Sequence, residues 1–426
     1  WQEGCSSRMR AEHRDFAAFL LLGVGTQWMV NDAVYQNMDV FTAVLPEGIR
    51  LPNTAGSLSG ALGPIFALSL WAVVCSTGLS LEKYLAANWI LAVYPPLVAF
   101  VVACAWRAVV GDTSIVIWAA LFLTNAGGQA SYFVQVPMLA RYFSETSVSA
   151  TMTGSGIGSM VAGGLGLIQA GTSSFSPMWV MLCVTFISAS STVAWYLIVS
   201  RGWGRIRLPE EGGGKKSTTE STLLVSETEQ RLWQPVMVAC LLMGALLNIT
   251  TWGISFLPYA SLGASCTCDP SDHIAQRNYD LATSLAYVAM PIGGFLSYVL
   301  PVYDVRFHAF LVSLHSFAYL LQTFAVVGVS FMNCSAGARV TVVLGNMVLR
   351  GVFQYVITMQ YRVINRLFEH STITRGRANA LYGQLTSWVS ILTSFIAYGL
   401  AEGQVVGCPS APFSPSPFGI AANHSR

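Results

Sequence analysis

Polar and aromatic side chains recur within one apolar stretch near the start of the chain. Helical spacing places them on two adjoining faces of a single helix: Asp32, Gln36 and Asp39 on one, and Trp28, Asn31 and Tyr35 on the other. The set offers carboxylate acceptors, amide donors and aromatic planes, which suits a planar polar ligand held by stacking and edge hydrogen bonds. The alternative is that Asn31 and Asp32 only bond neighbouring helices. Because an aspartate at the centre of a membrane helix costs about 2.5–3.5 kcal/mol, we favour a binding path that faces protein or water.

A second apolar stretch, residues 114–139, carries polar and aromatic groups beside a Gly-Gly pair. Its candidates for contact with a ligand are Asn125, Gln129 and Tyr132. A Gly-Gly pair lets backbones approach closely or lets a helix kink. Gln129 could therefore bind the edge of a ligand, and a packing seam of small residues is an alternative of equal weight.

The next apolar stretch contains a glycine-rich run, residues 151–166, that superficially resembles a nucleotide-binding loop. Such a loop follows a strand, whereas this run lies inside a stretch long enough to span a membrane. We therefore predict a tight helix–helix seam at its glycines, from which Ser155 could still reach a ligand.

The second half of the chain carries a similar set of polar groups. They are Asn248 and Thr251 in one apolar stretch and, at every fourth position of a later one, Asn346, Arg350 and Gln354. Arg350 is the one cation that we place well within a span, so it needs a carboxylate, an anionic ligand or water. Asp32 is the candidate partner, and the alternative is that Arg350 extends to an outer surface.

The composition predicts an integral membrane protein. Hydrophobic residues make up 54% and charged residues 10% of the 426 residues, and the mean hydropathy is +0.55. Soluble domains average about 25% charged residues. The net charge of +2 gives no reason to expect a nucleic-acid partner. The polar N-terminal segment lacks the cleavage pattern of a signal peptide.

No group of residues predicts catalysis. We find no defensible Ser/His/Asp or Cys/His arrangement and no phosphate-binding loop. The chain has nine cysteines without metal-ligand spacing, and Cys266 and Cys268 are too close together for a usual zinc site. We therefore expect that the protein is not an enzyme and that it binds no metal and no cofactor.

Apolar runs of about 20 residues predict membrane-spanning helices. We place about eleven of them, at residues 16–41, 54–76, 85–109, 114–139, 148–170, 177–199, 233–258, 281–303, 307–331, 340–364 and 378–400. The hydrophilic segment between the sixth and the seventh has the composition of a flexible linker. The predicted fold is an all-α polytopic membrane protein with an N-terminus (1–15), a six-helix bundle (16–199), a linker (200–232), a five-helix bundle (233–400) and a tail (401–426).

Loop charge predicts the orientation of the chain in the membrane. Lysine and arginine are far more numerous on the side of the N-terminus, so we place the N-terminus and the 200–232 linker in the cytoplasm and the tail outside the cell. Glycosylation sequons at Asn333 and Asn423 then fall outside, although each could arise by chance. Cys334 and Cys408 also fall outside, where disulfides persist, and we predict a bridge between them.

The first apolar stretch and the loop after it resemble the eukaryotic riboflavin transporters, solute carrier family 52. The resemblance is carried by the glycine-rich entry at 22–26, by Val30-Asn31 and by Leu45-Pro-Glu-Gly-Ile-Arg-Leu-Pro52. Weaker matches over most of the remaining chain are Asn125 to Pro137, Gly154-Ser-Gly156, Asn248 with Pro258, Tyr279 to Pro291 and Gly351 to Tyr355. The family has Gly, Glu and Pro where this chain has Asp32, Gln36 and Met38.

The resemblance implies about eleven spans in a six-plus-five arrangement, similar to equilibrative nucleoside and major-facilitator-like transporters, with alternating access between the halves. It implies uptake of riboflavin across the plasma membrane, by a protein that we expect to be a monomer. Riboflavin is then a transported substrate and the bilayer is the other partner. Two other functions stay open: a nucleoside-type transporter, because nucleosides are also planar rings bearing hydroxyls, and a transporter-like receptor that moves nothing.

Overall fold

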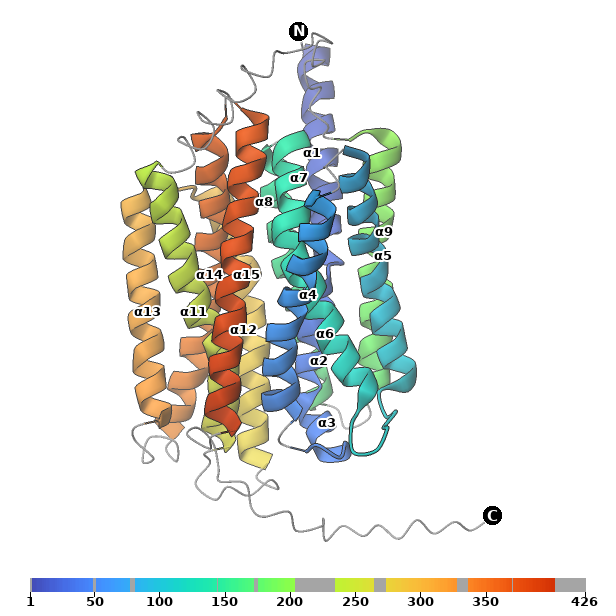
Figure 1. The fold of residues 1–426 in the computed structure, drawn as a ribbon, viewed down its shortest axis with the longest axis vertical. Coiled ribbons are helices and arrows are strands. Elements are labelled where there is room, and N and C mark those ends of the chain that lie inside the picture. The colour runs from blue at the N-terminus through green and yellow to red at the C-terminus, as the bar shows by residue number, and fades with distance from the viewer. Residues whose placement is uncertain are drawn as a thin grey trace.

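The computed structural model describes residues 2–48, 51–76, 81–143, 145–171, 175–203, 234–263, 273–327, 336–369 and 371–402. Over these residues the chain is almost entirely helical, and the only extended pairing among them is an isolated bridge between Val110 and Thr113. The long helices run roughly along one common axis (Figure 1). The prediction of an all-α fold is confirmed.

We call the helices before residue 204 the N-terminal half. They are α1 (Gln2–Val24), α2 (Gln27–Gln36), α3 (Met38–Val44), the π-helix η1 (Leu51–Gly56), α4 (Ser57–Ser76), α5 (Leu81–Ala105), α6 (Ile115–Ala130), the π-helix η2 (Ser131–Gln135), α7 (Val136–Tyr142), α8 (Glu145–Gly171) and α9 (Pro177–Arg201). The helices after residue 233 form the C-terminal half. They are α11 (Pro235–Gly263), α12 (His273–Val299), α13 (Val305–Val327), α14 (Ala336–Leu367) and α15 (Thr372–Glu402).

Helices overlap all the ranges predicted as spans, but the single helix predicted over residues 16–41 is wrong. The chain breaks between α1 and α2, where Thr26 has extended backbone angles, and again at Asn37. The first break lies against α9 and is possible because Gly25 has no side chain. A Cβ there would lie only 2.4 Å from the carbonyl oxygen of Ser188. This close approach redirects the chain just before its polar residues begin.

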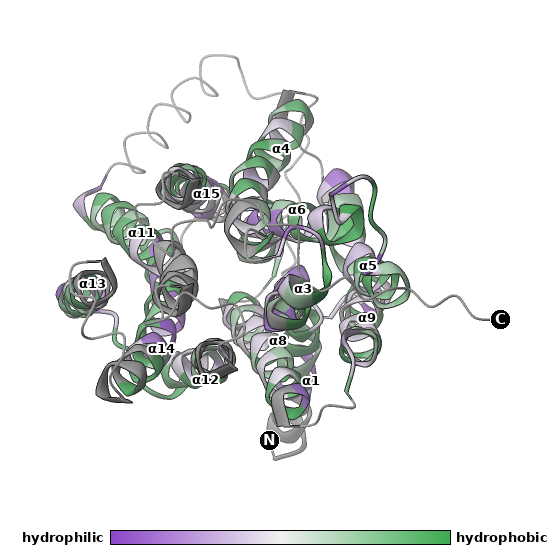
Figure 2. Cartoon of the chain, turned by 90° about the horizontal axis from the view of Figure 1, so that it is seen from below, coloured by the Kyte–Doolittle hydropathy of each residue, from purple (hydrophilic) through white to green (hydrophobic). Residues whose placement is uncertain are grey.

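The outside of the bundle is suited to lipid. Three helical segments among the described residues are long and apolar enough to cross a membrane: Glu82–Ala105, Pro177–Arg201 and Leu281–Val299. Large apolar side chains also face outward, as at Phe186, which is 79% exposed. Apolar residues predominate along the helices when the bundle is viewed down its long axis (Figure 2). The chain is a helical membrane protein, and the number of spans stays a prediction.

The two halves meet along two seams. Helix α8 packs against α12, and α15 packs against α4, η2 and α7. Glycine permits the closest contacts, as the glycine-rich run predicted. A Cβ at Gly163 of α8 would lie 2.8 Å from the Ser284 carbonyl oxygen, and one at Gly383 of α15 would lie 2.3 Å from the Tyr132 carbonyl oxygen. Close backbone contact of this kind is the usual way in which helices associate in lipid.

The Leu45–Pro52 block has a structural role that can be tested. Its Glu47 lies in the loop after α3 and reaches the start of α6. One carboxylate oxygen, Oε1, accepts hydrogen bonds from the Ser114 backbone N–H (2.6 Å), from Ser114 Oγ (2.8 Å) and from Trp118 Nε1 (3.1 Å). A carboxylate at a helix N-terminus satisfies backbone donors that lack an intrahelical partner and interacts favourably with the helix dipole.

We therefore expect Glu47→Ala to lower the stability of the protein by about 1–3 kcal/mol, because buried donors lose their acceptor. The melting temperature of the purified protein in detergent measures this. Asp112→Ala is the matched control, since Asp112 is an exposed carboxylate in the loop before the same helix. Equal melting temperatures for the two variants would show that Glu47 does not anchor α6.

Candidate functional site

Buried polar side chains from both halves meet inside the bundle. Hydrogen bonds between neutral groups cross from one half to the other. Ser284 Oγ donates to Gln36 Oε1 (2.7 Å), Ser387 Oγ donates to Gln129 Oε1 (2.9 Å), and Gln354 Nε2 donates to the Met152 carbonyl (2.8 Å). All of these residues are buried. We call this set, together with Asp32 and Arg350, the central polar layer.

Asp32 and Arg350 are the charged members of this layer. They come from α2 and α14, and they are only 7% and 6% exposed. The Asp32 carboxylate accepts hydrogen bonds from the side chains of Ser159 and Tyr287 and is attracted electrostatically by Arg350. Arg350 therefore does not extend to an outer surface, which was the alternative to pairing. A buried charge keeps its charged form only where opposite charge and hydrogen bonds replace water.

An aromatic wall borders the central polar layer on the side of α6 and η2. The rings of Trp28 and Tyr132 lie with their centroids 6.0 Å apart and tilted by 45°. Gly128 leaves room for the indole, because a Cβ there would lie 2.7 Å from its Cζ2. Asn31 and Gln27 fix α2 against α6: Thr124 Oγ1 donates to Asn31 Oδ1 (2.8 Å), and Gln27 Nε2 donates to the Gly127 carbonyl (2.9 Å).

Tyr35 lies near the two charged residues of the layer, because its hydroxyl interacts electrostatically with both Asp32 and Arg350. Its ring also fills the space that a side chain at Gly56 would need, with the hydroxyl oxygen 2.7 Å from an added Cβ. Tyr35 therefore lies between the charged residues and the junction of η1 with α4.

The remaining residues predicted from the sequence make local hydrogen bonds. Three of them bond a carbonyl one turn earlier in their own helix: Asn125 to Leu121 (2.8 Å), Ser155 to Met152 (2.8 Å) and Asn248 to Gly244 (2.7 Å). Thr251 Oγ1 lies 3.4 Å from His315 Nε2. These bonds, all made within one half, hold the side chains against helices that carry the layer.

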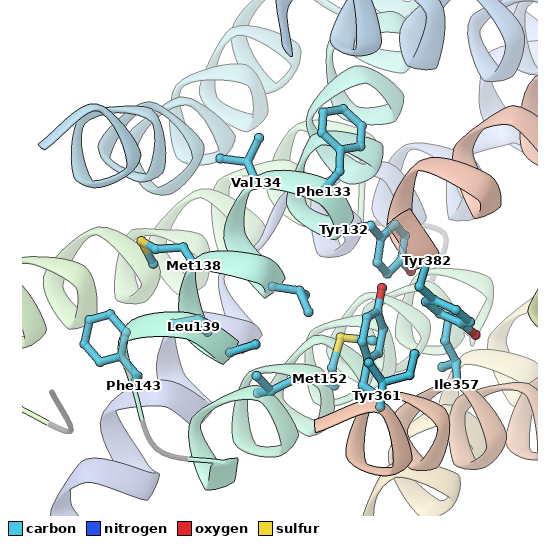
Figure 3. Packing of buried hydrophobic residues seen from close by; sticks show 14 of the residues in the cluster. Tyr132, Phe133, Val134, Met138, Leu139, Phe143, Met152, Ile357, Tyr361 and Tyr382 are labelled. Carbon is cyan, nitrogen blue, oxygen red and sulfur yellow. The ribbon is translucent and has the colours of Figure 1, made fainter. Parts of the chain in front are cut away.

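A tyrosine cluster next to Tyr132 was not predicted from the sequence. Tyr361 and Tyr382 come from α14 and α15, and their ring centroids are 4.9 Å apart at 75°. Figure 3 shows both rings converging on Tyr132 from the C-terminal half. The Tyr382 hydroxyl donates a hydrogen bond to Gln360 Oε1. With Trp28, these rings extend the aromatic wall across both halves.

His315 of α13 is a further buried polar residue that was not predicted from the sequence. Its Nδ1 lies 3.0 Å from Thr250 Oγ1, and its ring bonds the backbone at Leu349, the residue before Arg350. His315 therefore holds the helix turn that carries Arg350. A lone histidine in an apolar stretch gives no sequence signal for this role.

Several predicted features lie outside the described residues. They are the Cys334–Cys408 bridge, the sequons at Asn333 and Asn423, the pair Cys266 and Cys268, the linker beyond residue 203 and the tail beyond residue 402. Within the described residues, no group of three His, Cys, Asp or Glu side chains could hold a metal ion.

Comparison with known proteins leaves the function open. No family model and no curated protein matches the chain. Among solved structures, the nucleoside transporter NupG is similar over 91% of this chain and 90% of its own, with a TM-score of 0.47 and 14% identity. An inward-facing, unoccupied bacterial homologue of the human lysosomal transporter Spinster is similar over 91% and 83%, with a TM-score of 0.48 and 13% identity. Because both TM-scores lie below 0.5, we infer nothing about function from these likenesses.

Proposed function

We propose that the protein is a membrane transporter that carries a small, planar, polar molecule between its two halves, and that the molecule is riboflavin. The observation that supports this most is the central polar layer. Polar residues that are costly in a bilayer are concentrated where the two halves meet, and two of them are charged. Intramembrane ionisable residues of this kind mark substrate or ion pathways.

The bonds across the layer are weak enough to switch. Each neutral hydrogen bond contributes about 0.5–1.5 kcal/mol net, so the three neutral bonds named above add only about 2–4 kcal/mol to the contact between the halves. A substrate that replaces them with its own donors and acceptors can shift the equilibrium between conformations by a similar amount. Alternating access by movement of one half against the other needs an interface of this kind.

The chemistry of the layer suits a flavin. An isoalloxazine ring can stack on the wall of Trp28, Tyr132 and the tyrosines of the C-terminal half, while its carbonyl and imide edge bonds the glutamines. The hydroxyls of a ribityl chain can hydrogen-bond the serines and the charged residues of the layer. The resemblance of the Leu45–Pro52 block to riboflavin transporters supports the same substrate.

The proposal places the protein as a multi-pass monomer in the plasma membrane, with its N-terminus and the 200–232 linker in the cytoplasm. Arg141, Arg201 and Arg366 lie in the last turns of α7, α9 and α14, and Arg306 lies in the first turn of α13. These helix ends are at the end of the bundle at which α1 begins (Figure 1). This distribution supports the orientation, because cationic loops stay on the cytoplasmic side. The tail is then extracellular, with the proposed bridge between Cys334 and Cys408 and glycosylation at Asn333 and Asn423.

Uptake of labelled riboflavin into cells that express the protein tests the substrate. We expect saturable uptake that unlabelled riboflavin and lumiflavin reduce and that uridine does not, because only the flavins carry the tricyclic ring that fits the wall. Cells with empty vector provide the background. Competition by uridine and not by lumiflavin would instead assign a nucleoside-type carrier.

A further inference from the structure

We propose that the protein binds the phosphate head group of an anionic phospholipid between the ends of α12, α13 and α14. This site is separate from the central polar layer. It lies at the end of the bundle at which α1 begins, where α14 packs against both α12 and α13 (Figure 2).

Two arginines of α14 share one aromatic ring at this place. The guanidinium carbon of Arg366 lies 3.3 Å from the centroid of the Tyr303 ring, and that of Arg362 lies 5.4 Å from it. Arg362 also donates a hydrogen bond to the Ser297 carbonyl at the end of α12 (2.7 Å). Stacking and this bond hold both guanidinium groups in fixed positions, although their like charges repel each other.

No carboxylate neutralises this pair within the described part of the chain. The ion pair found there joins Arg14 to Asp15, not either of these arginines. The nearby Asp304 accepts a hydrogen bond from the Arg306 backbone N–H (2.9 Å). Its carboxylate therefore caps the start of α13. Arg362 Nε and the Tyr303 hydroxyl are buried without a hydrogen-bond partner. An anion with several acceptor oxygens would satisfy these donors, and guanidinium groups suit phosphate in particular.

The surroundings identify the anion as a lipid. Large apolar side chains beside the arginines face outward, namely Tyr298, Val299, Leu300, Phe307 and Phe310. Free phosphate has no apolar part that could cover this surface, whereas the acyl chains of a phospholipid would cover it. Basic pockets between membrane helices on the cytoplasmic side are known to bind lipid head groups.

Native mass spectrometry of the purified protein with added lipid tests the proposal. We expect retention of phosphatidylserine or phosphatidylinositol phosphate and little retention of phosphatidylcholine. Arg366→Gln should lower retention roughly fivefold, as expected for the loss of one cation near a lipid phosphate. Arg201→Gln is the matched control, because Arg201 is an exposed arginine at the same end of the bundle in α9, and it should change nothing.

Tyr303→Phe and Tyr303→Leu provide a second pair of variants. The first keeps the ring and removes the hydroxyl, so it should retain more lipid than the second, which removes the stack. Equal retention by wild type, Arg366→Gln and Tyr303→Leu would overturn the proposal. Displacement of the lipid by millimolar inorganic phosphate would also overturn it, because the site would then hold a free phosphate.

Discussion

Replacing Arg350 with glutamine is expected to lower the initial rate of riboflavin uptake at least about a hundredfold. Removal of one partner from a buried charge pair costs about 3–5 kcal/mol, because the other charge is left without compensation. Here that charge is the Asp32 carboxylate, which keeps only its hydrogen bonds from Ser159 and Tyr287. The rate should be divided by the amount of protein at the cell surface, measured by biotinylation.

The control for this variant is Arg107→Gln. Arg107 is exposed in the loop after α5 and stacks on the neighbouring Trp106 at 4.7 Å, so its loss should leave uptake unchanged. The double variant Asp32→Asn/Arg350→Gln should be closer to wild type in stability than the sum of the single variants predicts. Additive losses would show that the two charges do not interact.

The Asp32 carboxylate is also the group through which transport could be coupled to the movement of protons. A carboxylate inside a membrane protein can bind and release a proton during transport. If Asp32 does so here, Asp32→Asn should reduce uptake and also flatten its dependence on external pH. Unchanged uptake with an unchanged pH profile would remove Asp32 from the mechanism.

Gly154→Ala is expected to lower the stability of the protein strongly. Gly154 of α8 faces α1, and a Cβ there would lie 2.1 Å from the Leu20 carbonyl oxygen. A backbone carbonyl cannot move away as the end of a flexible side chain can, so α1 and α8 must separate. This should lower the stability of the protein by about 1–3 kcal/mol or more. We expect a clear loss of melting temperature in detergent and lower surface expression.

The same helix supplies the control. An added Cβ at Gly164 meets no atom within 4 Å, and alanine favours a helix over glycine by about 0.5–1 kcal/mol. Gly164→Ala should therefore be neutral or slightly stabilising. If the two variants melted at the same temperature, the α1–α8 contact would not be as close as the structure shows.

Much of the fold could be predicted because apolar length and helical period are local properties of the sequence. The break in the first helix could not, because it depends on the contact of Gly25 with Ser188, which are far apart in the chain. The burial of Asp32 within the electrostatic reach of Arg350 was predictable in outline, since buried charges of opposite sign stabilise each other.

Other parts of the site had no signal in the sequence. Ser284 and Ser387 are serines in apolar helices, where a hydroxyl usually bonds its own backbone. Their bonds to Gln36 and Gln129 exist only because α12 and α15 lie against the N-terminal half. Tyr361 and Tyr382 are in apolar helices like many other tyrosines, and only packing brings their rings to Tyr132.

Flux into proteoliposomes tests the central claim, that a flavin crosses the membrane through the layer between the two halves. We predict saturable entry of labelled riboflavin, faster when the liposomes are preloaded with unlabelled riboflavin, and absent with Arg350→Gln. Preloading accelerates a carrier because the loaded protein returns with substrate. Binding of riboflavin without flux, and without acceleration by preloading, would contradict the claim and indicate a receptor.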